Sequence, residues 1–288
     1  MLKPRIAKRE VTLHILRAFG LHASKRLGQN FLVDETVVDR IVAAAGVAPG
    51  DAVLEIGPGI GTLTQGLLEA GGTVVAVELD RRLVEVLADT LAGYDSLRVV
   101  HGDILKTDIS REMPTSPFKV VANLPYYITT PILMGILEQR LPVSVLVTMV
   151  QKEVAERMVA APSGKDYGAL SVAVQYYTAP EIAFFVPPHS FIPAPAVESA
   201  VIRCVVRSEP PVALASEATF FRVVKAAFAQ RRKTLANGLK AAGLAAADAA
   251  AVLAAAGIDG GRRGETLSLA EFAAVANAWE DNKNGRSL

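Results

Sequence analysis

Three glycines at alternate positions follow a short apolar run in the first third of the chain. The run ends at Ile56 and contains one acid, Glu55. The glycines are Gly57, Gly59 and Gly61, and a helix is predicted to begin at Thr62. An apolar run that ends in a glycine turn is typical of a buried parallel strand. Glycines let the backbone turn sharply and approach a ligand, and the first turn of the next helix presents free N–H groups there. The spacing predicts a nucleotide-type site at the carboxyl end of the first strand of an α/β sheet.

The glycine spacing differs from that of two well-known nucleotide-binding loops. The dinucleotide fingerprint G-x-G-x-x-G would place its third glycine where Thr62 stands, and the lysine of the phosphate-binding loop is missing. The pattern E-x-G-x-G-x-G resembles motif I of class I methyltransferases, which bind S-adenosylmethionine. For this stretch taken alone, a tight strand–helix turn without a ligand is the alternative.

Two acidic residues at the ends of later strands favour a bound nucleoside. Glu78 ends a second apolar run about twenty residues after Gly57, the distance at which an acid binds ribose hydroxyls. Asp80 is assigned instead to capping the helix that begins at Arg81. Asp103 follows a third strand, and its carboxylate is suited to accept hydrogen bonds from an adenine amino group. Two strand-end acids in order after a glycine loop support S-adenosylmethionine as the ligand.

The fourth predicted strand ends in a stretch suited to chemistry on an amino group. The lone pair of an exocyclic adenine nitrogen is delocalised into the ring, so acceptors around its hydrogens would favour a pyramidal, more nucleophilic nitrogen. The side-chain oxygen of Asn123 and the carbonyl oxygen of Leu124 are such acceptors, and Pro125 restricts the backbone. Tyr126 offers a face on which an extruded base can stack. A proline turn with a packing tyrosine is the alternative.

These motifs occur with three others. The stretch Asn123–Tyr126 resembles motif IV of N6-adenine methyltransferases, and the chain also contains LGQNFL at 27–32, FIPAPAVESA at 191–200 and FAQRRKTL at 228–235. Together they resemble the ribosomal RNA adenine dimethyltransferase family, most closely its members that act on bacterial 16S rRNA. The resemblance runs from about residue 25 to residue 266 and does not cover the first twenty residues or the tail after Trp279.

The resemblance implies a cofactor site and a target. The cofactor would be S-adenosyl-L-methionine, leaving as S-adenosyl-L-homocysteine, and its site would consist of Asn30, Leu32, Gly57, Gly59, Glu78, Asp103 and Asn123. Phe191 would stack on the target adenine opposite Tyr126, and neighbouring prolines are expected to hold Phe191 as an exposed surface. The target would be two adjacent adenosines in the 3′-terminal hairpin loop of 16S rRNA in the immature 30S subunit, each methylated twice. One departure is Tyr127, where many relatives have asparagine; it lies beyond the residues assigned to chemistry.

Other functions stay open at this point. A 23S rRNA adenine methyltransferase of the antibiotic-resistance type shares the sheet and the Asn-Leu-Pro-Tyr motif, but the proline-rich loop at Phe191 and the segment at 230–233 favour the 16S enzyme. A DNA adenine methyltransferase would need a target-recognition domain, for which about 80 helical residues leave little room. A mainly non-catalytic assembly factor of the small subunit is the alternative from a different class.

Apolar runs and helical patterns alternate through the first two thirds of the chain. Strands are predicted near 52–56, 73–78, 97–100, 119–122, 144–149, 181–186 and 199–207. Helices are predicted at 62–70, 81–92, 130–138, 152–160 and 167–177. This order is typical of a doubly wound sheet. We therefore expect an α/β Rossmann-like class I methyltransferase sheet, mostly parallel with an antiparallel last strand, and a small all-α C-terminal domain.

The predicted domain boundary lies near residue 207, before the linker Ser208–Pro211. Residues 1–207 would form the S-adenosylmethionine-binding catalytic domain, with a basic N-terminal arm at 1–33, and residues 208–288 a helical domain that binds and positions RNA. A single helix is expected from about Thr219 to Lys240. The basic residues expected to contact RNA phosphates are Lys25, Arg26, Arg222, Lys225, Arg231, Arg232 and Lys233. A merely solvated charged face is the alternative.

Composition limits the class of protein. The 288 residues are 51% hydrophobic and 20% charged, which predicts a globular chain large enough for a full core. The formal net charge is only +1, so contacts with nucleic acid must come from local basic clusters. No apolar run reaches the roughly 18 residues of a membrane span, and no signal-type segment is found. The single cysteine, Cys204, excludes an internal disulfide, and no metal site is expected. We expect a cytoplasmic monomer.

Overall fold

The computed structural model describes residues 4–24, 28–114, 117–230 and 232–285. The chain forms two compact units. The first runs to Ala155 and also includes Pro180–Val206, and the second comprises Glu156–Ala179 and the residues from Arg207 onward. Residues 156–179 therefore group with the C-terminal helices, whereas the sequence analysis placed a single boundary near residue 207.

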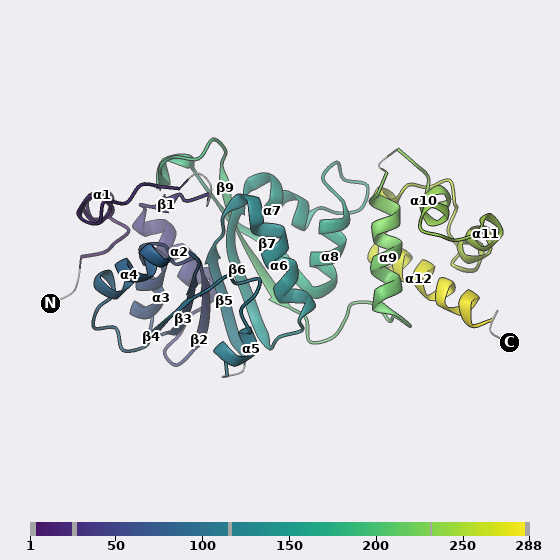
Figure 1. Ribbon diagram of the computed structural model, residues 1–288. Coiled ribbons are helices and arrows are strands. Elements are labelled where there is room, and N and C mark those ends of the chain that lie inside the picture. The colour runs from purple at the N-terminus through teal and green to yellow at the C-terminus, as the bar shows by residue number, and fades with distance from the viewer. Residues whose placement is uncertain (1–3, 25–27, 115–116, 231, 286–288) are drawn as a thin grey trace. The chain divides into compact units, whose positions relative to one another are not determined.

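A seven-stranded sheet built from the described residues forms the centre of the first unit, in the order β4-β3-β2-β5-β6-β9-β7 (Figure 1). The strands are β2 (Ala52–Ile56), β3 (Thr73–Glu78), β4 (Leu97–His101), β5 (Phe118–Asn123), β6 (Val143–Gln151), β7 (Thr178–Val186) and β9 (Ser199–Val206). Strands β2 to β6 pair in parallel, and β9 pairs antiparallel to β6. This confirms the predicted fold class.

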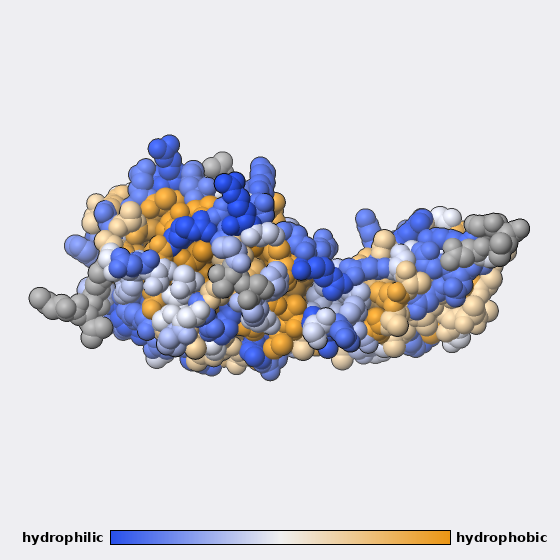
Figure 2. Space-filling model, turned by 90° about the horizontal axis from the view of Figure 1, so that it is seen from below, coloured by the Kyte–Doolittle hydropathy of each residue, from blue (hydrophilic) through white to orange (hydrophobic). Residues whose placement is uncertain are grey.

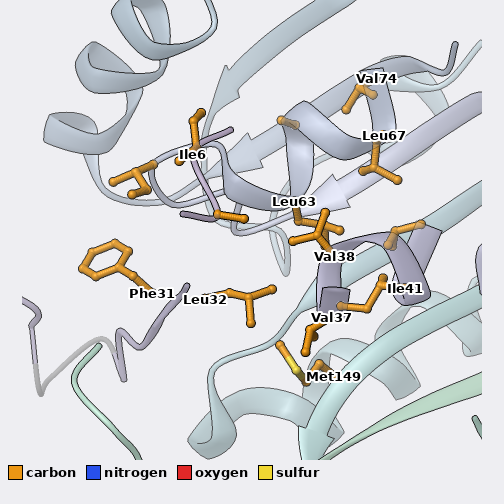
Figure 3. Packing of buried hydrophobic residues seen from close by; sticks show 14 of the residues in the cluster. Ile6, Phe31, Leu32, Val37, Val38, Ile41, Leu63, Leu67, Val74 and Met149 are labelled. Atoms are coloured by element: carbon orange, nitrogen blue, oxygen red, sulfur yellow. The ribbon is translucent and has the colours of Figure 1, made fainter. Parts of the chain in front are cut away.

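The parallel strands are covered on both faces, which explains their nearly continuous apolar sequences. In β2, Val53 and Leu54 point to opposite faces and both are fully buried. One face packs against α2 (Glu35–Ala45), α3 (Thr62–Glu69) and α4 (Arg81–Thr90). Figure 3 shows Val38 of α2 beside Leu63 of α3, and Met149 of β6 below α2. The first unit also contains α1 (Arg9–Ala18), α5 (Ile109–Glu112), η2 (Tyr126–Ile128) and α6 (Thr129–Glu138), and α7 (Lys152–Val159) crosses from the first unit into the second.

Two helices of the first unit begin with an aspartate cap, one of which, Asp80, the sequence predicts. Asp34 accepts a hydrogen bond from Thr36 N at 3.1 Å at the start of α2, and Asp80 accepts one from Arg82 N at 3.0 Å at the start of α4. Each carboxylate satisfies an N–H group that has no partner within its helix. The capping assignment of Asp80 is therefore confirmed.

The described N-terminal residues pack into the core of the first unit. Ile6 and Ala7 are buried, and Ile6 N donates to Gln65 Oε1 at 2.7 Å. Arg5 forms an ion pair with Asp39 at 2.7 Å. Although this segment is basic, contacts with α2 and α3 hold part of it. The charge of Arg5 is used in an ion pair within the protein.

The second unit consists of helices packed around aromatic side chains. Its longer helices are α8 (Ala169–Tyr177), α9 (Glu217–Phe228), α10 (Leu235–Ala241), α11 (Ala246–Ala255) and α12 (Leu269–Asn284). The hydroxyls of Tyr176 and Tyr177 donate to the carboxylate of Glu217 at 3.1 and 2.7 Å, and the Tyr177 ring stacks on Phe221 at 5.7 Å between centroids. These contacts explain why α8 groups with the C-terminal helices. A capping box formed by Ser268 and Glu271 begins α12.

The prediction of one helix from Thr219 to Lys240 is wrong. Helix α9 ends at Phe228, a turn follows in which Lys233 N donates to Gln230 O at 2.9 Å, and α10 begins at Leu235. Tertiary contacts cause the break, because α10 packs back against α9 and Leu235 N donates to Arg262 O at 2.7 Å. Basic residues on either side of the turn therefore do not share one helix face.

The surface mixes apolar with polar residues, as the face in Figure 2 shows. The large hydrophobic residues that are exposed in the described chain are Phe19, Leu79, Leu105, Tyr127, Phe185, Val197 and Val205. Within the described ranges, no helix is both long enough and apolar enough to span a membrane.

Candidate cofactor and target-base pocket

A pocket opens where β2, β3, β4 and β5 reach their carboxyl ends, the edge at which open α/β sheets bind ligands. The pocket together with the open solvent at its mouth spans about 1150 Å³. Its lining includes the complete set predicted for the cofactor, namely Asn30, Leu32, Gly57, Gly59, Glu78, Asp103 and Asn123. It also includes three further residues predicted for the target base, namely Leu124, Pro125 and Tyr126. The structure thus brings together residues from five separate segments of the chain.

The glycine loop forms the floor of the pocket without side chains. Gly57, Gly59 and Gly61 have φ values of +68°, +62° and +94°, in the left-handed region that side chains disfavour. A Cβ atom at Gly57 would meet nothing within 4 Å, whereas one at Gly61 would lie 2.9 Å from Leu91 Cδ1. The first two glycines therefore leave room for a ligand, and the third allows α3 to pack tightly.

Glu78 lies at the end of β3 and is held in one orientation by backbone donors. Its Oε2 atom accepts from Gly59 N at 3.1 Å and its Oε1 atom from Asp80 N at 2.8 Å. The side chain is 6% exposed, and this burial raises the pKa of Glu78 above its usual value. Each carboxylate oxygen keeps lone-pair capacity for a hydroxyl donor. The assignment of Glu78 to ribose binding stays a prediction.

Glu55 is a second acid at the pocket, and the sequence analysis treated it only as part of the glycine motif. It is 1% exposed, and its Oε2 atom has no hydrogen-bond partner among the described residues. Burial raises the pKa of Glu55 to about 8, with a smaller contribution from the charge of Glu78. The signal available in the sequence was an acid within an apolar strand, where an unpaired charge is costly.

Asp103 follows β4, and part of its carboxylate is used within its own loop. Its Oδ1 atom accepts from Leu105 N at 3.1 Å, and Lys106 Nζ lies 3.9 Å from its Oδ2 atom. The loop contact fixes the orientation of the carboxylate at the pocket wall. Its assignment to the adenine amino group stays a prediction.

Asn123 is positioned by the segment that precedes β1 (Phe31–Leu32). Its Nδ2 atom points toward Asn30 O at 3.5 Å, a long contact that leaves Oδ1 without a donor among the described residues. Leu124 N donates to Met149 O at 3.2 Å, which anchors the chain to β6 just before Pro125. An acceptor atom thus remains available at the pocket.

Tyr126 is fixed by its hydroxyl group, which forms a 2.6 Å hydrogen bond with Ser199 Oγ at the start of β9. Burial raises the pKa of Tyr126. The ring is half-buried and lines the pocket, so it presents a held aromatic surface there. Its role in stacking on a base stays a prediction.

Phe191 differs from expectation because it is buried rather than exposed. It is 2% exposed and does not line the pocket. It belongs to β8 (Phe191–Ile192), which pairs antiparallel with β1, Leu32 lying opposite Phe191. Ser190 Oγ also donates to Asp34 Oδ2 at 2.9 Å, 156 residues away in sequence. This pairing turns the ring into the core, so the expectation of an exposed surface is wrong, while a role in stacking stays untested.

The residues predicted to contact RNA fall into three groups. Lys25, Arg26 and Arg231 lie outside the described residues. Arg222 donates to Ala242 O and lies 4.8 Å from the centre of the Trp279 ring, so it packs within its own unit. Lys225, Arg232 and Lys233 are exposed. Contact with RNA stays a prediction for all of them. In the described parts of the chain, no three or more His, Cys, Asp or Glu residues are grouped as a metal site.

Comparisons with known proteins agree with this geometry. A family model described as ribosomal RNA adenine dimethylase matches residues 20–280. A ribosomal RNA small subunit methyltransferase A from Moorella thermoacetica is 51% identical over 280 residues, covering 93% of this chain and 96% of that protein. Among solved structures, a dimethyladenosine transferase from Plasmodium falciparum is similar with a TM-score of 0.76 and 25% identity, covering 88% of this chain and 98% of that one. The 23S rRNA methyltransferase ErmE is similar with a TM-score of 0.67 and 28% identity, covering 87% and 100%.

Proposed function

Because the chain belongs to the ribosomal RNA adenine dimethylase family, we propose that it transfers methyl groups from S-adenosyl-L-methionine to N6 of two adjacent adenosines in the 3′-terminal hairpin loop of 16S rRNA. Membership makes the chain an rRNA adenine methyltransferase. One observation carries the proposal: Asn123 and its neighbours share a pocket with the glycine loop and the strand-end acids. An acceptor for an amino group therefore lies beside a nucleoside-type site.

The residues present fit S-adenosyl-L-methionine. The open side of Gly57 gives a ligand close approach to the backbone, and the carboxylate of Glu78 can accept from ribose hydroxyls. Glu55 adds a buried polar atom that has no described partner, Oε2, at the same pocket. When bound, this cofactor supplies a methyl group on a positive sulfonium, so transfer is favourable without prior removal of a proton from the amine.

The residues of the chain then act on the target base. Asn123 Oδ1 accepts a hydrogen bond from the adenine amino group and favours a pyramidal nitrogen. Pro125 limits the backbone conformations of this stretch, and the ring of Tyr126, held by Ser199, stacks on the extruded base. The methylated amine afterwards loses its proton to water. Asn123 thus has a role toward both the cofactor and the target.

The names of the relatives support the small ribosomal subunit as the substrate. The relative that is 51% identical to this chain is named a small-subunit methyltransferase, whereas the 23S rRNA methyltransferase is only 28% identical. We propose that the immature 30S subunit is the substrate, that the helices after residue 207 position the RNA, and that the enzyme works in the cytoplasm as a monomer. S-Adenosyl-L-homocysteine is the expected product, and no metal is proposed.

The substitution Asn123→Ala separates catalysis from a purely assembly-related role. We expect the variant to lose methyl transfer to 30S subunits from labelled S-adenosylmethionine while it still binds the subunits. The matched control is Asn282→Ala, on α12 in the second unit, which should transfer methyl groups at the rate of the wild type. Methylation by the Asn123 variant near the wild-type rate would contradict the role of this residue.

A further inference from the structure

Tyr127 is an exposed aromatic residue at the mouth of the pocket that the proposed reaction does not use. It is 58% exposed, more than any other large hydrophobic residue in the described chain, and it lines the pocket. Single exposed hydrophobic residues are common on protein surfaces, so the informative observation is that this exposed ring lines a pocket. It belongs to η2, the short helix between β5 and α6, two elements that Figure 1 labels.

Tyr126 and Tyr127 are neighbours in η2, yet they have different surroundings. In a 3₁₀-helix, successive side chains point about 120° apart, so the two rings face different directions. The hydroxyl of Tyr126 is bonded to Ser199, whereas the hydroxyl of Tyr127 has no hydrogen bond to any residue that the structure describes. The exposed position of Tyr127 is therefore not explained by a polar contact within the described chain.

The ring of Tyr127 nevertheless packs against the protein at Gly28. A Cβ atom at Gly28 would lie 3.3 Å from Tyr127 Cδ1 and 3.4 Å from Pro125 Cβ. Gly28 has φ +61°, so both its conformation and its lack of a side chain let the ring lie against the backbone. One part of the ring is thus supported by the protein while the remainder faces solvent. A held aromatic surface binds with little loss of side-chain entropy.

We propose that Tyr127 is a stacking platform for the nucleobase next to the target adenosine. Moving a target base into the pocket removes it from its stack, so the adjacent base loses a stacking partner. An aromatic ring at the mouth of the pocket replaces that partner regardless of sequence, since every base has a flat face. With two adjacent adenosines as substrate, the base on Tyr127 is the second target while the first reacts. This inference rests on the proposed function.

The cofactor is a poorer occupant for this ring. The cofactor residues Gly57 and Glu78 lie after β2 and β3, whereas Tyr127 follows Asn123, from which the acceptor for the target amine projects. Tyr127 therefore shares its segment with Leu124 and Tyr126, which are assigned to the target base alone. If the ring stacks on RNA, its removal should weaken the use of the RNA substrate and leave the affinity for the cofactor unchanged.

The test compares Tyr127→Ala and Tyr127→Phe with the wild type on unmethylated 30S subunits. We expect Tyr127→Ala to lower kcat/KM for the subunits by about 5- to 100-fold, mainly through KM, as loss of one base–aromatic stack does. Tyr127→Phe should stay within about twofold of the wild type, because the ring is kept. The dissociation constant for S-adenosylmethionine, measured by calorimetry, should be unchanged in both. The control is Phe185→Ala, which removes an exposed aromatic ring on β7 away from the pocket.

The outcomes separate this inference from the proposed function. If the wild type methylates 16S rRNA and Tyr127→Ala does so with the same KM, the stacking role is wrong. Weaker S-adenosylmethionine binding by Tyr127→Ala would assign the ring to the cofactor and also overturn the inference. An equal loss in Tyr127→Phe and Tyr127→Ala would show that the hydroxyl matters and not the ring. If the wild type transfers no methyl group, the proposed function itself fails.

Discussion

The substitution Glu55→Gln should change how the stability of the protein depends on pH. Glu55 is fully buried in β2, and burial raises its pKa to about 8 from the ordinary value of 4.5. Glutamine has nearly the same shape and stays neutral at every pH. The variant therefore keeps the packing of the strand and removes only the ionisation of this one group.

The sign follows from the raised pKa. Between about pH 4.5 and pH 8 the unfolded chain releases the Glu55 proton while the folded protein keeps it, so the free energy of unfolding falls as pH rises through this window. A pKa raised from 4.5 to about 8 corresponds to an upper limit of about 5 kcal/mol in the free energy of unfolding. Relaxation of the structure around a buried charge reduces this value, so we expect about 2–3 kcal/mol between pH 5.5 and pH 8.

Urea unfolding followed by circular dichroism measures this effect at the two pH values. Other titrating groups contribute nearly equally to both proteins, so the difference between variant and wild type isolates Glu55. The free energy of unfolding of Glu55→Gln minus that of the wild type should be larger at pH 8 than at pH 5.5. Hydrogen exchange of the β2 amides should show the same trend. A difference that does not change with pH would mean that Glu55 is ionised in the folded protein, and the reasoning about its burial would be refuted.

Three other predictions concern RNA binding, packing and acid stability. Substituting alanine for Arg231, Arg232 and Lys233 should weaken binding of 16S rRNA and flatten the salt dependence of that binding, while the affinity for S-adenosylmethionine stays unchanged. An unchanged salt slope would show that these residues form a solvated surface and do not contact RNA phosphates. Gly66→Ala in α3 should lower the free energy of unfolding by about 1–3 kcal/mol, because the added Cβ would lie 2.6 Å from Val38 Cγ1. The control is Gly135→Ala in α6, where a Cβ has room, and urea unfolding should show it to be neutral or stabilising. The Arg262 guanidinium lowers the pKa of Glu271 to about 2, so this pair stabilises the protein above about pH 4.5, and the stabilisation is lost as pH falls from there through 2. Because both side chains are about one third exposed, we expect Glu271→Gln to cost about 1 kcal/mol at pH 7 and a small fraction of that at pH 2.

Local patterns were sufficient to predict the sheet and the pocket. The predicted strands at 52–56 and 73–78 have the observed bounds of β2 and β3, because buried parallel strands have distinctive apolar sequences that end in glycines or acids. Since parallel strands place their carboxyl ends at one edge, residues that follow them, such as Glu78 and Asn123, must lie close together. The cofactor set could be placed in one pocket for that reason.

Features that depend on distant contacts could not be predicted in the same way. Phe191 is buried because β8 pairs with β1 across most of the catalytic unit, and nothing in the proline-rich sequence around it encodes that partner. The helix expected from Thr219 to Lys240 carries a continuous apolar stripe, and only the return of α10 onto α9 shows where it breaks. The raised pKa of Glu55 also follows from burial by elements remote in sequence.

The most direct test of the account is to incubate the protein with labelled S-adenosylmethionine and unmethylated 30S subunits, with 50S subunits and DNA in parallel, and to map the labelled nucleotides. We predict label as N6,N6-dimethyladenosine at two adjacent positions of the 3′-terminal 16S hairpin, and none in the other substrates. Label only in 23S rRNA, or tight 30S binding without label in any substrate, would contradict the proposed function.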